Sequence, residues 1–568
     1  MRRALLVLIA LAAGLAAVTA MLAPRARTRL AVKPDETLVR GAIHVHTRIS
    51  DGAGTPDDVA RAAAKAGLDF VVLTDHGDGT RKPTPPRYVD GVLVIDAVEI
   101  STTGGHYVAL GLEQAPYRLA GEPRDVIEDV TRLGGFGIAA HPDSPKAELS
   151  WREWQAPFNG IEWLNADSAW RDERRRALVR ALIGYWLRGP EVIASLLDRP
   201  VTTLVRWDAL TRRRMVVGLA GHDAHARMGP RGEWEPTAGS YSLRLPSYVA
   251  TFRAFSLSVA LGAPLSRRDP HADAAAVLGA VRAGRITTVI DAVAGPARLA
   301  FAASHVGGQT PMGGDVRPGV DVSLAASLEP PAPGAGLHLL KDGVVVARST
   351  DGLIVFAHAA LSAPAVYRVE GVWPGAPGVP PVPWVVGNPI RVGFTPPRAS
   401  VPLLLPAQWA MPAPVDGWRI EQHPASVTTL TPTILTPTNT AWTMTWRLGT
   451  GAPAGQYAAM AVDVPPGFVR RADRLSFTIR SAAPMRVSVQ IRIGSSGMRW
   501  QRSIYVSPSP TEQSIAVREL TPVGAEPGTP LDLARVDAIL FVVDTVNTAP
   551  GSTGEVWVSE VRAAGSGN

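Results

Sequence analysis

Histidine and carboxylate side chains that could bind metal ions recur between residues 44 and 225, where seven of the chain's 12 histidines lie. His44 and His46 are two positions apart, as are Asp223 and His225. On a β-strand this spacing directs both side chains to one face, where two imidazoles can reach one ion at about 2.0–2.1 Å. A single pair of this kind usually binds nothing, but the repetition of such motifs is typical of a metal centre.

Five further candidate ligands end or follow short apolar runs, and they are Asp51, His76, Glu99, His106 and His141. A capping role or a satisfied core position would account for any one of them alone. Neither accounts for ionisable residues at the ends of successive runs. Neutral imidazole combined with carboxylate suits zinc, manganese or iron. The sequence therefore predicts a site for divalent metal ions.

The elements that must position these residues alternate along the chain from about residue 41 to residue 295. Short runs rich in valine and isoleucine, such as GAIHVH and FVVLTDH, are separated by amphipathic stretches. In the first stretch Thr55 is the expected N-cap and Gly67 the expected stop. This alternation predicts parallel β/α units, and about seven of them predict an α/β barrel that collects the ligands at one end. Residues 171–215 are predicted to be a helical insertion, either a solvated basic surface or a lid that contacts anionic lipid or substrate.

After Pro296 the helical periodicity disappears, and alternating strands are separated by turns rich in proline and glycine. The pattern predicts all-β sandwich modules. A proline-rich break near residue 397 divides them into an Ig-like module over 297–396 and a galactose-binding-like module over 397–568. Glycan contact by the last module is one expectation, although core packing is the expected role of most of its tryptophans: Trp418, Trp442, Trp446 and Trp500.

The N-terminal residues 1–26 are predicted to be a signal peptide or a membrane anchor, because Met1-Arg2-Arg3 precedes an uncharged apolar run. The protein is then expected outside the cytoplasmic membrane, exported or anchored through its N-terminus. The 568 residues contain no cysteine, which excludes disulfides, cysteine–zinc sites and thiol catalysis. The formal charge is +7 without a basic run interleaved with aromatics, so no nucleic-acid partner is expected.

Five segments, HVHTRISDG, LTDH, VEI with GGH, AHP and GHDAH, resemble in order the motifs of the PHP (polymerase and histidinol phosphatase) superfamily. The resemblance covers about residues 40–295 and implies that residues 27–296 form a distorted barrel of seven β/α units with two or three metal ions. It implies three ligand groups: His44, His46, Glu99 and Asp223 for one ion; Glu99 as a bridge to a second ion with His106 and His141; Asp51, His76 and His225 for a third.

The implied chemistry is hydrolysis by a hydroxide that bridges two cations, most simply of a small phosphorylated ester. Glu99 and Asp223 would then be catalytic through the ions. His222 is a candidate general acid or a partner of a ligand, although a core or surface packing role is the more expected one. Asp75 and Asp143 are further candidate partners of ligands. The candidate groups for a substrate anion are Arg48, Lys146 and Arg227.

Two other functions fit the same residues. The first is a carbamate or carboxyl-ester hydrolase of the same superfamily, because metal ligands do not report the leaving group. The second is a non-catalytic envelope protein whose β-modules bind glycan or a partner protein, which a complete ligand set argues against.

Overall fold

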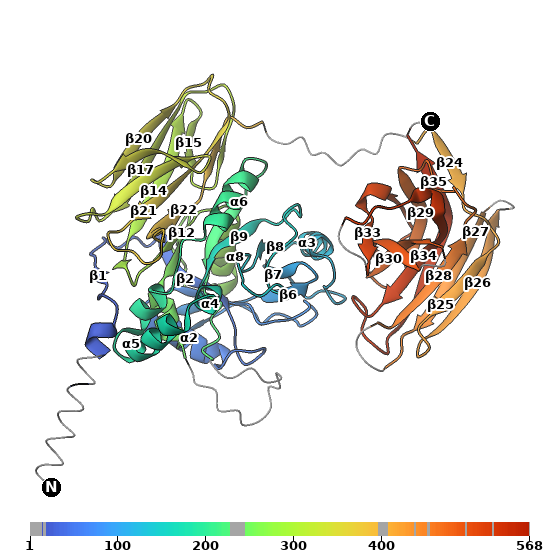
Figure 1. The fold of residues 1–568 in the computed structure, drawn as a ribbon, viewed down its shortest axis with the longest axis horizontal. Helices are drawn as coiled ribbons and strands as arrows, with labels where there is room; N and C mark the ends of the chain where they lie inside the picture. Colours follow the sequence, from blue (N-terminus) through green and yellow to red (C-terminus); the bar gives the residue numbers. More distant parts are fainter. Residues whose placement is uncertain are drawn as a thin grey trace, which may run out of the picture. The chain divides into compact units, whose positions relative to one another are not determined.

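The computed structural model describes residue 14 and residues 19–227, 245–395, 407–436, 439–450, 455–494, 497–524 and 528–566. The chain forms two compact units, each built mostly of β-strands (Figure 1). The first unit comprises residues 1–113 and 122–397, and the second comprises residues 114–121 and 398–568.

The candidate ligands lie in a ring of strands in the first unit. A five-stranded sheet has the order β10-β9-β8-β7-β6, and its strands are β6 (Val98–Thr102), β7 (Gly105–Leu110), β8 (Phe136–Ala139), β9 (Gly160–Asn165) and β10 (Val217–Gly221). Three parallel strands of a second sheet are β2 (Leu38–Val45), β3 (Phe70–Leu73) and β5 (Val92–Asp96). The amide of Ala224 donates to the carbonyl of His44, and the amide of Gly77 donates to the carbonyl of Glu99. These bonds join the two sheets on both sides.

Helices cover only part of this ring, so a seven-unit β/α barrel is not shown. Helix α2 (Pro56–Ala66) joins β2 to β3, with the expected cap at Thr55 and stop at Gly67, both confirmed. Between β4 (Arg87–Val89) and β5, a tight turn at Asp90 and Gly91 has positive φ at both residues. Another hairpin at Gly105 makes β6 and β7 antiparallel. Tight hairpins leave no chain length for a crossover helix, which is why the alternation fails here.

Three helices occupy the segment predicted as a helical insertion, between β9 and β10. They are α4 (Ala166–Arg171), α5 (Arg175–Ala194) and α6 (Val201–Thr211). Backbone angles at Arg188, two residues before Pro190, are not helical and divide α5 into two parts. The remaining elements around the ring are α3 (Pro123–Arg132), α7 (Tyr248–Ala254), β11 (Ser256–Ala260), α8 (Pro270–Arg282) and β12 (Ile286–Val289).

The β-module that follows shares a sheet with the ring. Strand β12 pairs with β22 (Val385–Gly387), so the boundary expected at residues 296–297 falls inside the first unit. The module's other strands in this sheet are β16 (Asp315–Val316), β18 (Gly336–Lys341), β19 (Val344–Ser349), β21 (Ala365–Val372) and β23 (Ile390–Val392). Four more strands form a separate sheet: β14 (Arg298–His305), β15 (Gly308–Pro311), β17 (Val322–Glu329) and β20 (Leu353–His358). The short strands β1 (Thr28–Arg29) and β13 (Ala294–Gly295) pair with each other.

The second unit is a sandwich of two six-stranded sheets around one apolar core. One sheet contains β24 (Trp409–Pro412), β26 (Val427–Thr436), β27 (Asn439–Arg447), β29 (Arg474–Ser481), β32 (Thr511–Ala516) and β35 (Thr553–Gly565). The other contains β25 (Trp418–Gln422), β28 (Tyr457–Asp463), β30 (Met485–Ile493), β31 (Met498–Val506), β33 (Thr521–Val523) and β34 (Val536–Asp544). Trp446 and Trp500 lie in the core, and Trp418 and Trp442 pack against it. Core packing of the four tryptophans is thus confirmed.

The predicted leader lies mostly outside the described residues, which begin with residue 14 and then residue 19. Within the part of the chain that the structure describes, we find no helix that combines the length and apolar character needed to cross a bilayer.

Candidate metal centre

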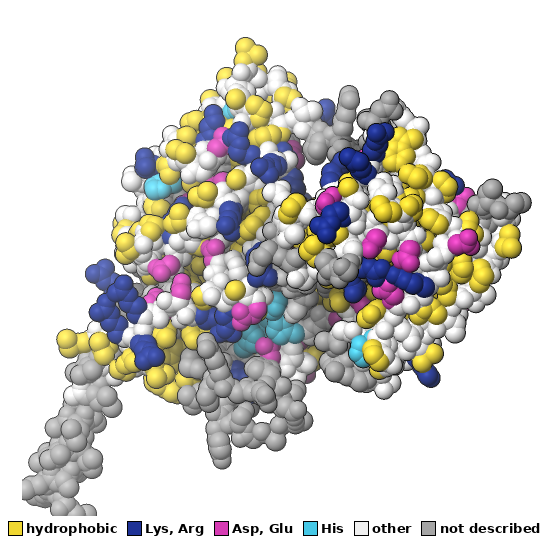
Figure 2. All heavy atoms as spheres, turned by 45° about the vertical axis from the view of Figure 1, so that its right-hand side comes forward, with side chains coloured by type: hydrophobic (Ala, Val, Ile, Leu, Met, Phe, Trp, Pro, Cys, Tyr) yellow, Lys and Arg dark blue, Asp and Glu magenta, His cyan; other side chains and the backbone are white. Residues whose placement is uncertain are grey.

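The structure brings all nine predicted ligands together inside the ring. His44 lies in β2, Glu99 in β6 and His106 in β7, and the other six lie in the loops that follow β2, β3, β8 and β10. Their donor atoms form four overlapping groups: His46, Asp51, His76 and His225; His44, Glu99 and His141; His44, His46 and Asp223; His76, Glu99 and His106. The cluster reaches the surface, where histidine side chains gather next to acidic ones (Figure 2).

Glu99 lies at the middle of the cluster and uses its two oxygens on different sides. Oε2 lies 3.2 Å from Nε2 of His44 and 3.2 Å from Nε2 of His46. Oε1 lies 2.8 Å from Nδ1 of His106 and 2.9 Å from Nε2 of His141. A carboxylate placed in this way can contribute one oxygen to each of two neighbouring cations.

Three buried atoms in the described part of the centre have no hydrogen-bond partner: Nε2 of His44, Nε2 of His46 and Oε2 of Glu99. A fourth donor atom, Oδ1 of Asp223, lies 3.5 Å and 3.3 Å from the two imidazole nitrogens. Ligand atoms around a tetrahedral ion at about 2.0–2.1 Å are separated by roughly 3.3 Å. Buried polar atoms without partners are costly, and each of the two carboxylate oxygens lies at about this separation from both imidazole nitrogens. The residues present therefore fit a divalent cation.

A second, more exposed group is organised around Asp51. Its Oδ2 lies 3.1 Å from Nε2 of His225 and 3.4 Å from Nε2 of His76, and its Oδ1 lies 3.1 Å from Nδ1 of His46. The side chain of His76 is 35% exposed, whereas that of His46 is fully buried. This side of the cluster is therefore the one that a substrate in solution can approach.

Backbone distortion helps to aim the ligands. His44 has φ of 68°, Asp223 has φ of 44° and His141 has φ of 28°, all in the left-handed region that non-glycine residues rarely adopt. The pairing of β2 with β3 shifts register between Ala42 and Val45, which places His44 in a bulge. Bulges of this kind redirect side chains next to functional sites. The two imidazoles therefore converge through a bulge and not through the regular strand that their spacing predicted.

The electrostatics of the centre are those of a cation site. Burial lowers the pKa of His44, but the neighbouring carboxylates, first that of Glu162, raise it well above its usual value. Burial would raise the pKa of Glu99, but the imidazoles around it, first that of His44, hold it well below its usual value. A divalent ion and a proton compete for the same imidazole nitrogens, so metal binding at this centre is favoured as pH rises.

Glu162 in β9 is a functional residue that the sequence analysis missed. Its Oε1 lies 2.6 Å from Nδ1 of His44, and its Oε2 accepts from the amide of His141 at 2.7 Å and from Asn165 at 2.9 Å. This buried carboxylate orients two ligands and leaves Nε2 of His44 directed at Glu99. The sequence did contain a signal for Glu162: a carboxylate lies inside the apolar run GIEWLN, and a buried carboxylate needs polar partners.

Asp75 orders the loop that carries Asp51. Its oxygens accept from the amide of Thr47 at 2.8 Å, from the hydroxyl of Thr47 at 2.7 Å and from the hydroxyl of Ser50 at 2.6 Å. It therefore acts on the loop and not directly on an imidazole. Asp143, the other candidate partner of a ligand, belongs to none of the four donor groups.

His222 is turned away from the donor atoms. Its Nδ1 faces the carbonyl of Ile43 at 3.3 Å, its Nε2 faces the carbonyl of Phe255 at 3.1 Å, and its ring stacks on Phe255. Burial lowers the pKa of His222 to about 4, so the ring is neutral at physiological pH. This geometry is that of a packing residue between β2 and β11, and we assign it no proton transfer.

The three cationic side chains predicted to bind a substrate anion lie in different surroundings. Arg48 is exposed, and its Nε donates to the carbonyl of Ala53 at 3.0 Å. Lys146 is half-buried in the loop after His141. Arg227 is half-buried and lines a cavity next to Asp223 and His225. Contact of any of the three with substrate stays a prediction.

Two solved structures resemble parts of the chain at low identity. One is a two-domain protein from Bacteroides vulgatus described as containing a predicted PHP-like metal-dependent phosphoesterase: identity is 14%, coverage is 65% of this chain and 99% of that one, and the TM-score is 0.29. The other is a family 11 carbohydrate-binding module from Clostridium thermocellum: identity is 16%, coverage is 27% of this chain and 91% of that one, and the TM-score is 0.22.

Sequence comparison gives two relatives, whereas no family model matches the chain. The chain is 33% identical over 92 residues to a 3′,5′-nucleoside bisphosphate phosphatase from Chromobacterium violaceum, covering 15% of this chain and 32% of that phosphatase. It is 31% identical over 145 residues to an uncharacterized protein from Methanocaldococcus jannaschii, covering 22% of this chain and 82% of the archaeal protein. Because the match spans most of the archaeal protein, the chain belongs to the family of this uncharacterized protein.

Proposed function

We propose that the first unit is a PHP-type metal-dependent hydrolase that cleaves a small phosphoester with two or three bound zinc, manganese or iron ions. The observation that carries this proposal is the convergence of three buried, unpartnered donor atoms, on His44, His46 and Glu99, inside a cluster of nine candidate ligands. A purely structural role would leave these atoms unsatisfied at a cost of about 1–3 kcal/mol each.

The chain's own residues have distinct tasks in this reaction. When bound, the ions supply a water of lowered pKa and neutralise charge on the phosphoryl group. Glu99 would be a ligand of the bound ions, because each of its two oxygens faces a different pair of imidazoles. Glu162 fixes the ring of His44 through Nδ1 and thereby keeps Nε2 available for an ion. Asp75 holds the loop of Asp51 at the exposed side, where substrate enters.

The phosphoester bond is favoured over a carbamate or carboxyl ester by the segment of 92 residues that resembles a bisphosphate phosphatase. Location outside the cytoplasmic membrane, as an exported chain or one anchored through its N-terminus, is part of the same proposal. Its support is the basic head and the apolar run of residues 1–26. Glycan contact by the second unit stays a prediction: Trp446 and Trp500 lie in the core, whereas Trp418 and Trp442 are only partly buried.

The proposal is tested by measuring metal content together with a substrate panel. The purified chain should retain two or more transition ions and hydrolyse p-nitrophenyl phosphate or its bis-ester with Mn²⁺ or Zn²⁺. A chelator should abolish turnover, and added metal should restore it. Turnover of p-nitrophenyl acetate or a carbamate with no turnover of either phosphoester would contradict the phosphoesterase assignment. Absence of bound transition metal would contradict the hydrolase itself.

Replacing Glu162 by glutamine should weaken metal binding about 10- to 100-fold, because an amide holds the His44 ring less strongly than a carboxylate. Isothermal titration with Zn²⁺ checks this, and Glu148→Gln is the matched control because Glu148 is exposed in a loop. An affinity equal to that of the unmodified chain would show that Glu162 does not orient a metal ligand.

A further inference from the structure

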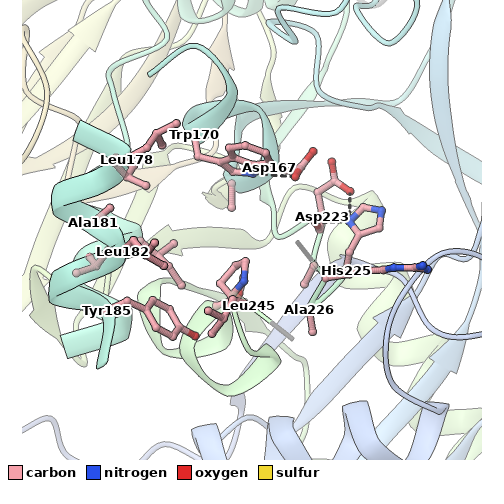
Figure 3. Close-up of a pocket in the computed structure, with 18 of the residues that line it drawn as sticks. Asp167, Trp170, Leu178, Ala181, Leu182, Tyr185, Asp223, His225, Ala226 and Leu245 are labelled. Carbon is pink, nitrogen blue, oxygen red and sulfur yellow. Dashed lines mark hydrogen bonds and ion pairs between the residues drawn. The ribbon is translucent and has the colours of Figure 1, made fainter. Parts of the chain in front are cut away.

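An apolar cavity of about 290 Å³ lies next to the candidate metal centre. It lies between α4 and α5 on one side and, on the other, residues 222–227, which follow β10, with Leu245 and Pro246, which precede α7 (Figure 3). Sites for small molecules begin at about 300 Å³, so this cavity can hold part of a substrate. Its lining is mostly carbon.

Helix α5 supplies a stripe of four side chains to the cavity. Leu178, Ala181, Leu182 and Tyr185 are spaced i, i+3, i+4 and i+7, and all four line it. Figure 3 shows them on the side of α5 that faces Asp223 and His225. A stripe of this spacing normally packs into a core. Here Leu182 is 48% exposed, so the stripe borders open space.

The polar atoms of the two aromatic lining residues already have partners. The indole N–H of Trp170 donates to Asp167 at 2.9 Å. The hydroxyl of Tyr185 accepts from the amide of Ser247 at 2.7 Å and donates to its Oγ at 3.3 Å. What these residues offer to the cavity is therefore carbon surface. A polar group placed against these two rings would lose its hydration without a compensating bond.

The cavity and the metal centre share a wall. Asp223 and His225 line the cavity, and both belong to groups of candidate metal ligands. A substrate with its ester group at the centre therefore has this cavity as a neighbouring space for a substituent.

We propose that the cavity binds an alkyl chain of the substrate, which makes the substrate an amphiphilic phosphoester. This inference rests on the proposed function, because the phosphoryl group is taken to lie at the metal centre. Each buried methylene contributes about 0.8 kcal/mol, or roughly fourfold in affinity. Chain length should therefore increase affinity until the cavity is filled.

Binding of alkylphosphonates tests the cavity without turnover. Isothermal titration of the metal-loaded chain should show octylphosphonate binding at least about 100-fold more tightly than methylphosphonate, the gain expected when about three to four of its seven additional methylenes are buried. Ala181→Trp fills the cavity, and Leu182→Asp places a charge in it. Each substitution should abolish most of the difference in affinity between the two phosphonates. Val205→Asp is the matched control, because Val205 is 62% exposed on α6 and does not line the cavity. Equal affinities for the two phosphonates would overturn the inference.

Hydrolysis of methyl and octyl p-nitrophenyl phosphate separates this inference from the function on which it rests. Turnover of both esters with equal kcat/KM would overturn the alkyl pocket and leave the phosphoesterase intact. Tighter binding of octylphosphonate without turnover of either ester would support the pocket and contradict the function. A further assay with a p-nitrophenyl phospholipid in phosphatidylcholine vesicles distinguishes the source of the alkyl group. Turnover of the phospholipid identifies a membrane lipid as the substrate, and turnover of the soluble ester alone identifies a soluble amphiphile.

Discussion

Replacing Glu99 by glutamine should lower kcat/KM for the preferred phosphoester at least about a hundredfold and reduce the number of tightly bound ions. The amide is uncharged and has one acceptor oxygen, whereas Glu99 presents Oε2 to His44 and His46 and Oε1 to His106 and His141. In the variant, one of these two pairs of imidazoles therefore no longer faces a carboxylate oxygen. Metal analysis and steady-state kinetics on the same preparation check both effects.

The control for Glu99→Gln is Glu36→Gln, because Glu36 is exposed and belongs to none of the donor groups. It should match the unmodified chain in metal content and rate. Circular dichroism should show that both variants keep the β-sheet content of the two units. Full activity of Glu99→Gln with an unchanged metal content would refute the bridging role.

The candidate ligands could be found from the sequence because each stands at a recognisable place, where an apolar run ends. Glu162 stands inside such a run, between Ile161 and Trp163, and its partners His44 and His141 are far away in the sequence. No local spacing connects these residues. The converse case is His222, whose position next to Asp223 suggested chemistry as well as packing, and whose ring packs on Phe255.

The fold was predictable where local rules determine it. The capping box at Thr55 and the left-handed Gly67 define α2 within a few residues of sequence. Pairing between distant strands is not encoded in this way. The bonds of β12 with β22 connect segments almost a hundred residues apart, and they make the ring and the first β-module one unit. Composition changes at Pro296, but the sheet does not end there.

A buried ion network stabilises this single unit by tying the helical insertion to the β-module. Arg368 in β21 is 2% exposed and contacts Asp208 of α6 at 2.7 Å and Glu370 at 2.5 Å. Arg199 completes the network with two bonds of 2.8 Å to Glu370. Burial would raise the pKa of Glu370, but Arg368 and Arg199 hold it below its usual value. Arg368 is thus the buried cation that Asp208 and Glu370 share.

Replacing Arg368 by methionine should lower the free energy of unfolding by about 3–5 kcal/mol, because Asp208 and Glu370 lose the buried cation that they share. Urea titration measures the loss, and Arg348→Met on the exposed strand β19 should change stability little. Adding Asp208→Leu and Glu370→Leu to Arg368→Met should recover much of the loss, since the triple variant buries no unpaired carboxylate and Arg199, whose side chain is 22% exposed, can reach solvent. If Arg368→Met is as stable as Arg348→Met, the network does not hold α6 to the module. A large loss with recovery in the triple variant would assign the cost to the unpaired carboxylates, because the methionine itself is common to both variants.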